Sequence, residues 1–150
     1  MLHPDFKDLL LALGAERVEY LVIGGYAVSF HAKPRFTKDI DLWVRDDSEN
    51  LARLAAALET FGAPATVLNS LRSGAADEIA WFGIPPTRVD ILRSVSGGDF
   101  GAAYASRVDA DWDGVPVSIV GLDTLIALKR AAGREQDLRD VRALERRKTP

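Results

Sequence analysis

The spacing of apolar residues changes along the chain and predicts both helices and strands. Apolar residues recur every three or four positions in four segments, which is the pattern of an amphipathic helix packed on a core. Pro4 suits a first helical turn, whereas Gly14, Gly62 and Gly133 end the patterns that precede them. The four predicted helices span residues 4–13, 48–61, 122–132 and 135–147.

Shorter apolar segments predict strands. Residues 18–23 form an apolar run with β-branched side chains, and a pair of glycines ends it. Residues 39–44 alternate strictly, so one face of this strand is apolar and the other carries Asp39 and Asp41.

Two pairs of strands with turn residues between them predict β-hairpins. Asp113-Gly114 is a strong turn pair, and the earlier hairpin closes around residues 83–86. We expect Trp81 and Phe82 of the earlier hairpin to lie in the core. The predicted hairpin strands span residues 78–82, 88–92, 108–112 and 115–120, and short helices are expected at 26–32 and 99–107.

The order of these elements predicts the fold class. Helices and strands are mixed, and the later strands form antiparallel hairpins rather than repeated strand–helix–strand units. We therefore expect an α+β fold in which helices pack against a small mixed β-sheet. A chain of 150 residues can form one hydrophobic core and is short for two, so residues 1–150 are predicted to be a single domain.

Composition narrows the class of protein. Hydrophobic residues make up 47% and charged residues 27%, which argues against a disordered or fibrous chain. No apolar run approaches the ~20 residues of a membrane helix, and the N-terminal residues lack the pattern of a secretory signal. The chain has no cysteine and only two histidines, which excludes disulfides, zinc–thiolate sites and multi-histidine metal sites. A cytoplasmic protein without membrane association is therefore predicted.

Charge is distributed unevenly. Residues 1–128 hold 11 basic and 18 acidic side chains, whereas residues 129–150 hold 8 basic and 4 acidic ones. The net charge of −3 therefore hides a basic C-terminal segment. This segment either contacts an anionic partner or is the solvated face of a final helix.

Three aspartates interrupt apolar strands. Asp39 and Asp41 are two residues apart, so both carboxylates lie on one face of their strand. Asp90 lies between Val89 and Ile91 on a later strand, and the three carboxylates meet if the two strands pair. Clustered carboxylates repel each other, and hard divalent cations such as Mg²⁺ or Mn²⁺ compensate for that repulsion. The alternative is that each aspartate is exposed on an edge strand.

Gly24-Gly25 lies between a predicted strand and a predicted helix. Two residues without side chains let backbone N–H groups approach a ligand closely, and a helix N-terminus attracts phosphate. The pair alone is weak support for phosphate binding, since a tight turn also explains it.

In combination, these features resemble a known motif. Residues 21–44, LVIGGYAVSFHAKPRFTKDIDLWV, are similar to the motif of the polymerase β-type nucleotidyltransferase superfamily, with 13 residues between Gly25 and Asp39. Asp90 matches the third acid of the superfamily in type and order. Residues 35–41 and the later segments 125–129, 133–134 and 137–140 look like those of small stand-alone members, some of which belong to toxin–antitoxin or phage-defence pairs. The resemblance extends over about residues 18–145. It implies a nucleotidyltransferase fold.

The resemblance also implies a role for each residue of the motif. Asp39 and Asp41 would bind two metal ions, and Asp90 would bind the catalytic ion and help to deprotonate an acceptor hydroxyl. Gly24 and Gly25 would contact the β- and γ-phosphates of a nucleoside triphosphate. The implied reaction is in-line attack of the acceptor on the α-phosphate, which transfers a nucleoside monophosphate and releases pyrophosphate.

Basic residues are further candidates for the nucleotide site. Arg35 and Lys38 lie in the loop before the first acid and either hold triphosphate oxygens or are ordinary loop charges. Lys129 either faces the nucleotide, as a basic residue often does in the superfamily, or forms an ion pair with Asp137 or Asp140.

Other polar and aromatic residues have structural interpretations. Arg134, Asp137 and Asp140 are expected to tie the last two helices together. His31 is expected to have a capping or surface role. Trp43 shares a strand face with the first two acids, and it either borders the nucleotide pocket or packs under a later helix.

Two functions remain open at this point. The first is a metal-dependent nucleotidyltransferase whose acceptor is a protein, a tRNA end or a small molecule. The alternative is a non-catalytic antitoxin or binding module of the same fold that acts through protein–protein contact. A cognate toxin or antitoxin, or tRNA, is a candidate partner, and the overall acidity argues against tight non-specific DNA binding. The presence of all three acids favours the enzyme.

Overall fold

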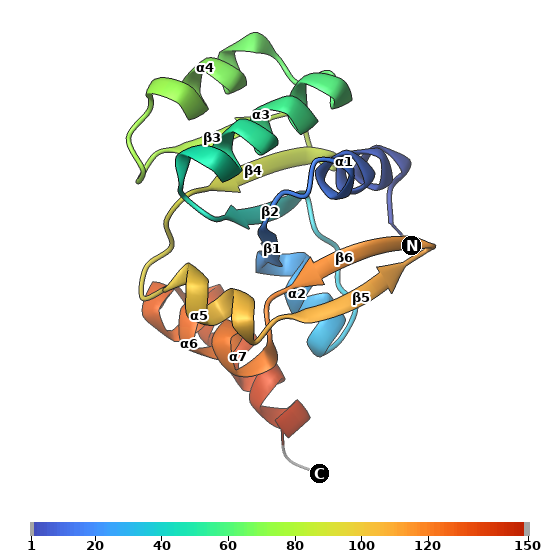
Figure 1. Cartoon of the computed structure of the whole chain (residues 1–150). Coiled ribbons are helices and arrows are strands. Elements are labelled where there is room, and N and C mark those ends of the chain that lie inside the picture. Colours follow the sequence, from blue (N-terminus) through green and yellow to red (C-terminus); the bar gives the residue numbers. More distant parts are fainter. Residues whose placement is uncertain (1, 149–150) are drawn as a thin grey trace.

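The computed structural model describes residues 2–148, and the outermost residues of the predicted domain, 1, 149 and 150, lie outside the described part. Six strands form one mixed sheet in the order β3-β4-β2-β1-β6-β5, and helices pack against it (Figure 1). The predicted α+β fold with a mixed sheet is therefore confirmed. In chain order the elements are α1 (Pro4–Ala15), β1 (Tyr20–Ile23), α2 (Gly24–His31), β2 (Asp39–Val44), α3 (Ser48–Phe61), α4 (Ala65–Ser73), β3 (Ile79–Phe82), β4 (Arg88–Leu92), α5 (Phe100–Ala105), β5 (Val108–Trp112), β6 (Val115–Ile119), α6 (Leu122–Ala132) and α7 (Glu135–Lys148).

Strands β1, β2 and β4 form the centre of the sheet. β2 pairs with β1 in antiparallel and with β4 in parallel orientation. In the pairing of β2 with β4, Asp41 lies opposite Asp90. The alternation of β2 buries Ile40 and Leu42 completely, whereas Asp39 and Asp41 are half-buried on its other face. The two strands that carry the predicted acids are thus neighbours.

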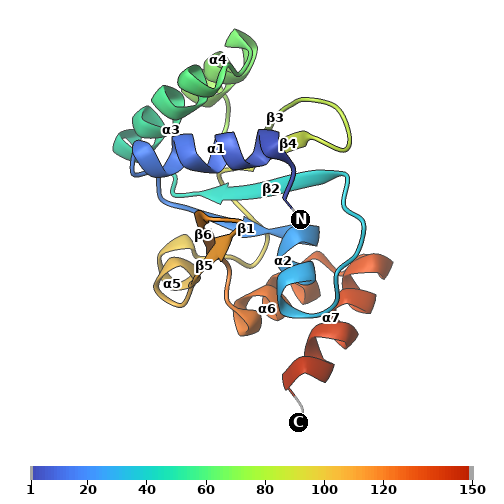
Figure 2. The same cartoon turned by 90° about the vertical axis from the view of Figure 1, so that its right-hand side faces the viewer.

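Helices form a layer on each side of the sheet. α1 and α3 lie on one face, and α2, α6 and α7 lie on the other (Figure 2). Leu9 and Leu13 of α1 and Leu54 and Leu58 of α3 are fully buried. Burial of each such leucine stabilises the folded state by roughly 1.5–3 kcal/mol relative to an exposed side chain. Because this core fills one face of β2, the acids point toward the layer of α2, α6 and α7.

Most predicted boundaries agree with the structure to within two residues. The helix predicted at 26–32 begins at Gly24, so both glycines belong to its first turn. The sequence does not predict α4, because no side chain caps its first turn and its core face consists only of Val67, Leu68 and Leu71. Among residues 2–148, no helix combines the length and the apolar character that a membrane crossing requires.

The expectation that Trp81 lies in the core is wrong, whereas Phe82 is buried as expected. β3 is an edge strand, and its alternation sends these neighbouring side chains to opposite faces. Phe82 contacts Phe61 of α3, with ring centres 6.0 Å apart. Trp81 therefore points to the opposite face of the sheet, where it is 54% exposed.

Candidate active site

The three predicted acids meet at the centre of the sheet. Carboxylate oxygens of Asp39, Asp41 and Asp90 lie within 4.8 Å of one another. The parallel pairing of β2 with β4 produces this cluster, because it sets Asp41 beside Asp90. All three residues are half-buried on strands that lie inside the sheet, so the pairing of their strands is confirmed and exposure on edge strands is excluded.

Burial and mutual repulsion change the acidity of this cluster. Burial, together with the neighbouring carboxylates of Asp39 and Asp90, raises the pKa of Asp41 to about 7. Burial also raises the pKa of Asp39, and its hydrogen bond with Asp90 acts in the same direction. The cation-free cluster therefore holds protons at pH values at which ordinary aspartates are ionised. Its oxygen donors and excess negative charge suit a hard divalent cation.

Gly24 and Gly25 allow the start of α2 to lie directly against the acids. The φ of Gly24 is +70°, which L-residues with side chains rarely adopt, and a Cβ atom there would collide with the carboxylate of Asp41. A Cβ atom on Gly25 would lie 2.5 Å from Cγ2 of Thr37 and 3.4 Å from Nη2 of Arg35. Neither position has room for a side chain without movement of its neighbours.

The first turn of α2 has backbone N–H groups available for a ligand. The helix begins at Gly24, and its N-cap residue, Ile23, forms no side-chain hydrogen bond with that turn. Such N–H groups carry partial positive charge and bind phosphate oxygens readily. This is the arrangement that phosphate contacts by the two glycines require.

Arg88 belongs to the site, although the sequence analysis does not single it out. Its Nε donates a hydrogen bond of 2.9 Å to Oδ1 of Asp90, and its guanidinium carbon lies 4.4 Å from the ring centre of Trp81. The spacing in the sequence could have indicated this contact, because Arg88 and Asp90 are two residues apart on β4 and therefore share a face of the sheet. Arg88 thus places a positive charge directly beside the third acid.

A chain of ion pairs links the loop before β2 to the C-terminal helices α6 and α7. Nζ of Lys129 on α6 lies 3.3 Å from Oδ1 of Asp137 and 3.1 Å from Oδ2 of Asp140. Nη1 of Arg35 donates a hydrogen bond of 2.5 Å to Oδ1 of Asp140. Nε of Arg134 donates one of 2.7 Å to Oδ2 of Asp137. Both aspartates and Lys129 are largely buried, so water screens the pairs of Lys129 poorly, whereas the side chain of Arg134 is mostly exposed.

These contacts bear on interpretations that the sequence leaves open. Of the two interpretations of Lys129, the structure shows the ion pairs with Asp137 and Asp140, which join α7 to α6. The charge of Lys129 also partly offsets the rise in the pKa of Asp41. Burial alone would raise the pKa of Asp137, but hydrogen bonds from Arg134 and Lys129 outweigh burial and lower it. The expectation that Arg134 ties the last two helices together is wrong, because Arg134 directly precedes α7 and pairs with Asp137 in the first turn of that same helix.

The remaining candidates lie around this centre. Lys38 is exposed in the loop before β2. Nε2 of His31 donates a hydrogen bond of 2.7 Å to the carbonyl oxygen of Val120. Trp43 is only 2% exposed, and its ring centre lies 5.3 Å from that of Phe100 on α5. Trp43 therefore packs under a later helix rather than bordering a nucleotide pocket.

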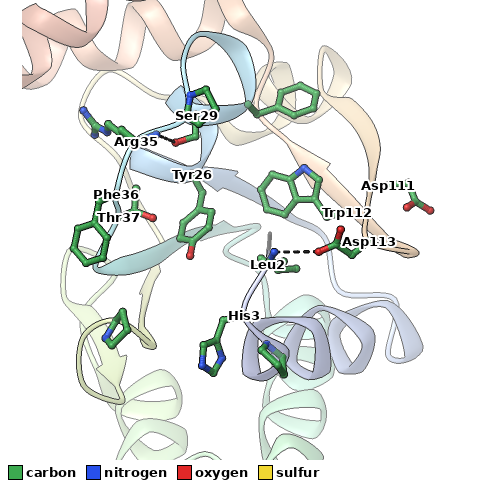
Figure 3. Close-up of a pocket in the computed structure, with 14 residues that line it drawn as sticks. Leu2, His3, Tyr26, Ser29, Arg35, Phe36, Thr37, Asp111, Trp112 and Asp113 are labelled. Atoms are coloured by element: carbon green, nitrogen blue, oxygen red, sulfur yellow. Dashed lines mark hydrogen bonds between the residues drawn. The ribbon is translucent and has the colours of Figure 1, made fainter.

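A pocket of about 700 Å³ adjoins the loop between α2 and β2 (Figure 3). The acid cluster does not line it, but Arg35 and Thr37, which flank Gly25, do. The sequence does not predict this pocket because its walls come from distant segments. Aromatic side chains contribute much of the wall: Tyr26, Phe30, Phe36 and Trp112.

Comparisons with known proteins agree with the resemblance seen in the sequence. The fold matches a crystal structure of ANT(2″)-Ia in complex with adenylyl-2″-tobramycin, with a TM-score of 0.56 and 16% identity, over 93% of this chain and 84% of that chain. A comparison with curated proteins gave no match. Residues 5–147 match a family described as a nucleotidyltransferase of unknown function (DUF6036). Because this match spans nearly the whole sequence, the chain belongs to that family of nucleotidyltransferases.

Proposed function

We propose that this chain transfers a nucleoside monophosphate from a nucleoside triphosphate to an acceptor hydroxyl. Membership of a nucleotidyltransferase family supports this class of reaction. The observation that carries the proposal is the cluster of Asp39, Asp41 and Asp90 directly against Gly24 at the start of α2. Acids and phosphate-binding N–H groups then lie side by side, and phosphoryl transfer depends on such positioning and charge neutralisation.

Two divalent cations, Mg²⁺ or Mn²⁺, are the proposed cofactors. Three carboxylates within 4.8 Å offer the oxygen ligands that these ions prefer. The raised pKa values of Asp39 and Asp41 also indicate a charge that is unbalanced without a cation. When bound, the ions would neutralise the charge that develops on the phosphates. Asp39 and Asp41 would hold both ions, and Asp90 would hold one of them.

The chain itself would bind and orient the triphosphate. The two glycines would donate backbone hydrogen bonds to the β- and γ-phosphates. Arg35, Lys38 and Lys129 would contact phosphate oxygens from the loop before β2 and from α6. Arg35 and Lys129 share Asp140 as a partner, so phosphate must compete with that carboxylate for these two basic side chains.

The proposed step is a single displacement at phosphorus. The acceptor oxygen forms a bond to the α-phosphorus as the bond to the oxygen that bridges the α- and β-phosphates breaks. Pyrophosphate leaves with the electron pair of that bond. The hydroxyl proton passes to a carboxylate, for which Asp90 is our candidate because it lies at the edge of the cluster nearest β3.

The acceptor and the macromolecular partner remain predictions. A protein, a tRNA end and a small molecule are the candidate acceptors, and a cognate toxin or antitoxin is the candidate partner. A cytoplasmic location also remains a prediction. The competing function is a non-catalytic module, and one experiment separates it from the enzyme.

That experiment is thermal unfolding with each nucleoside triphosphate, with and without Mg²⁺ or Mn²⁺. A ligand at ~100 times its Kd stabilises the folded state by about 2.7 kcal/mol. For a chain of this size, the midpoint should rise by roughly 5–10 °C. Asp41→Asn should lose this metal-dependent rise.

Asp8→Asn is the matched control, because it makes the same chemical change at an exposed position on α1. This variant should keep the full rise in midpoint. A native chain whose midpoint does not change with any triphosphate and metal would favour the non-catalytic module. A rise that persists in Asp41→Asn would remove the acid cluster from the nucleotide site.

A further inference from the structure

Four residues form a row across four neighbouring strands. Trp81 of β3 lies opposite Asp90 of β4, Asp90 pairs with Asp41 of β2, and Asp41 lies opposite Ile23 of β1. Gly24 follows Ile23. The row therefore leads from the glycine turn, which is Gly24 and Gly25 at the start of α2, through Asp41 and Asp90 to the edge of the sheet. Neighbouring strands are ~4.8 Å apart, which puts the backbone of Trp81 on the order of 10 Å from that of Asp41.

This row gives the proposed reaction a direction. Pyrophosphate is the leaving group, and in the proposed function Gly24 and Gly25 hold it at one end of the row. An in-line displacement requires the acceptor to approach from the side opposite to the leaving group. The acceptor must therefore approach across Asp90 from the side of β3, where Trp81 lies.

The side chains at that end offer a flat surface and a positive charge. Trp81 is 54% exposed on the face that carries the acids, and the guanidinium of Arg88 lies over one face of its ring, 4.4 Å from the ring centre. The side chain of Arg88 is 35% exposed, so its guanidinium is accessible to a ligand. Exposed indole and guanidinium groups stack on nucleobases, and arginine also pairs with phosphate.

We propose that Trp81 and Arg88 form the acceptor site and that the acceptor is the 3′-terminal nucleotide of a single-stranded polynucleotide. Its base stacks on Trp81, its phosphate contacts Arg88, and its terminal hydroxyl lies near Asp90. This inference rests on the proposed function and names its acceptor class. Contact with one terminal nucleotide also suits a chain with a net charge of −3, because no extended basic surface is needed.

Binding and transfer with a fluorescent single-stranded hexaribonucleotide test the proposal. In the presence of Mg²⁺ and nucleoside triphosphate, the native chain should bind the oligonucleotide and label its 3′ end. Trp81→Ala should weaken binding by about 5- to 150-fold, because a stacked base contributes ~1–3 kcal/mol. Trp81→Phe should restore most of the affinity, and blocking the 3′ hydroxyl should abolish labelling. We leave Arg88 unchanged because it also pairs with Asp90.

Leu11→Ala is the control, since Leu11 is 51% exposed on α1, on the other side of the sheet. Neither Leu11→Ala nor Trp81→Ala should change the rise in melting temperature caused by triphosphate and Mg²⁺. If that rise is present but Trp81→Ala binds the oligonucleotide as the native chain does, the inference fails and the proposed function stands. Labelling of a protein instead of the oligonucleotide also overturns the inference. Absence of the rise in the native chain overturns both.

Discussion

A Cβ atom on Gly24 would collide with the carboxylate of Asp41, so the glycine turn and the second acid are fitted to each other. Gly24 has a φ of +70°, and the Asp41 carboxylate occupies the space that a side chain would need. The start of α2 and the centre of β2 are therefore in direct contact. This contact sets how closely the backbone N–H groups at the start of α2 and the carboxylate oxygens of Asp41 approach each other.

Gly24→Ala should lower both stability and nucleotide binding. An alanine at positive φ costs roughly 1–2 kcal/mol, and displacement of the Asp41 carboxylate adds to that cost. Gly114→Ala is the matched control, because Gly114 has a φ of +88° and an added Cβ would meet nothing within 4 Å. Urea unfolding should therefore show a larger loss for Gly24→Ala than for Gly114→Ala.

A double-mutant cycle identifies the cause of that difference. In an Asp41→Ala background the colliding carboxylate is gone, so Gly24→Ala should cost less than it does in the native chain. An equal cost in both backgrounds would show that backbone strain alone explains the effect.

Asp41 should make the metal-free protein less stable as pH rises. This carboxyl titrates near 3.8 in the unfolded chain and at about 7 in the folded chain. Between these values the folded state keeps a proton that the unfolded state has lost, so stability falls from about pH 4 to about pH 7. Asp41→Asn should remove a penalty on the order of 2–4 kcal/mol at about pH 8 and almost none at about pH 4. Urea unfolding of both proteins in a chelator measures this difference, and a difference that does not change with pH would contradict it.

Asp137 should have the opposite dependence on pH. Its pKa is lowered in the folded state, so its contribution is present above about pH 4 and is lost as pH falls through the folded-state pKa. Asp137→Asn should therefore cost about 1–3 kcal/mol near pH 7, because Arg134 and Lys129 lose a charged partner. The cost should shrink in acid. Unfolding free energies of the native chain and the variant as a function of pH test this, and a cost that grows in acid would refute it.

The ion pair between Arg35 and Asp140 should couple the loop before β2 to α7. Asp140 has a side-chain exposure of 4%, so a cycle of Arg35→Met and Asp140→Asn should give a coupling energy of about 1–3 kcal/mol. The control pair, Arg139 and Glu135, is exposed on one helix face and should give about 0.3–0.5 kcal/mol. Similar values for both cycles would show that the buried pair does not hold the loop.

The acid cluster could be predicted because two local signals agree. The alternation of β2 puts Asp39 and Asp41 on one face, and Asp90 lies between apolar residues on a strand of the same kind. Only the pairing of the two strands required the structure. The resemblance to nucleotidyltransferases rested on the same residues, and family membership confirms it.

The features that the sequence did not predict depend on long-range order. Trp81 is exposed because β3 lies at the edge of the sheet, and the order of strands cannot be derived from the alternation of one strand. Arg35 and Asp140 are 105 positions apart, so no local spacing relates them. Only the packing of α7 near the start of β2 brings them together, which is a property of the tertiary fold.

The ion pairs around Asp137 and Asp140 also have a consequence for how the molecule is made. Synthesis proceeds from the N-terminus, so the glycine turn and all three acids leave the ribosome before α6 and α7. Until α7 is made, neither Arg35 nor Lys129 has the carboxylate of Asp140 as a partner. The nascent chain thus carries the two glycines and the three aspartates early, and their surroundings are complete only after α6 and α7 have also been synthesised.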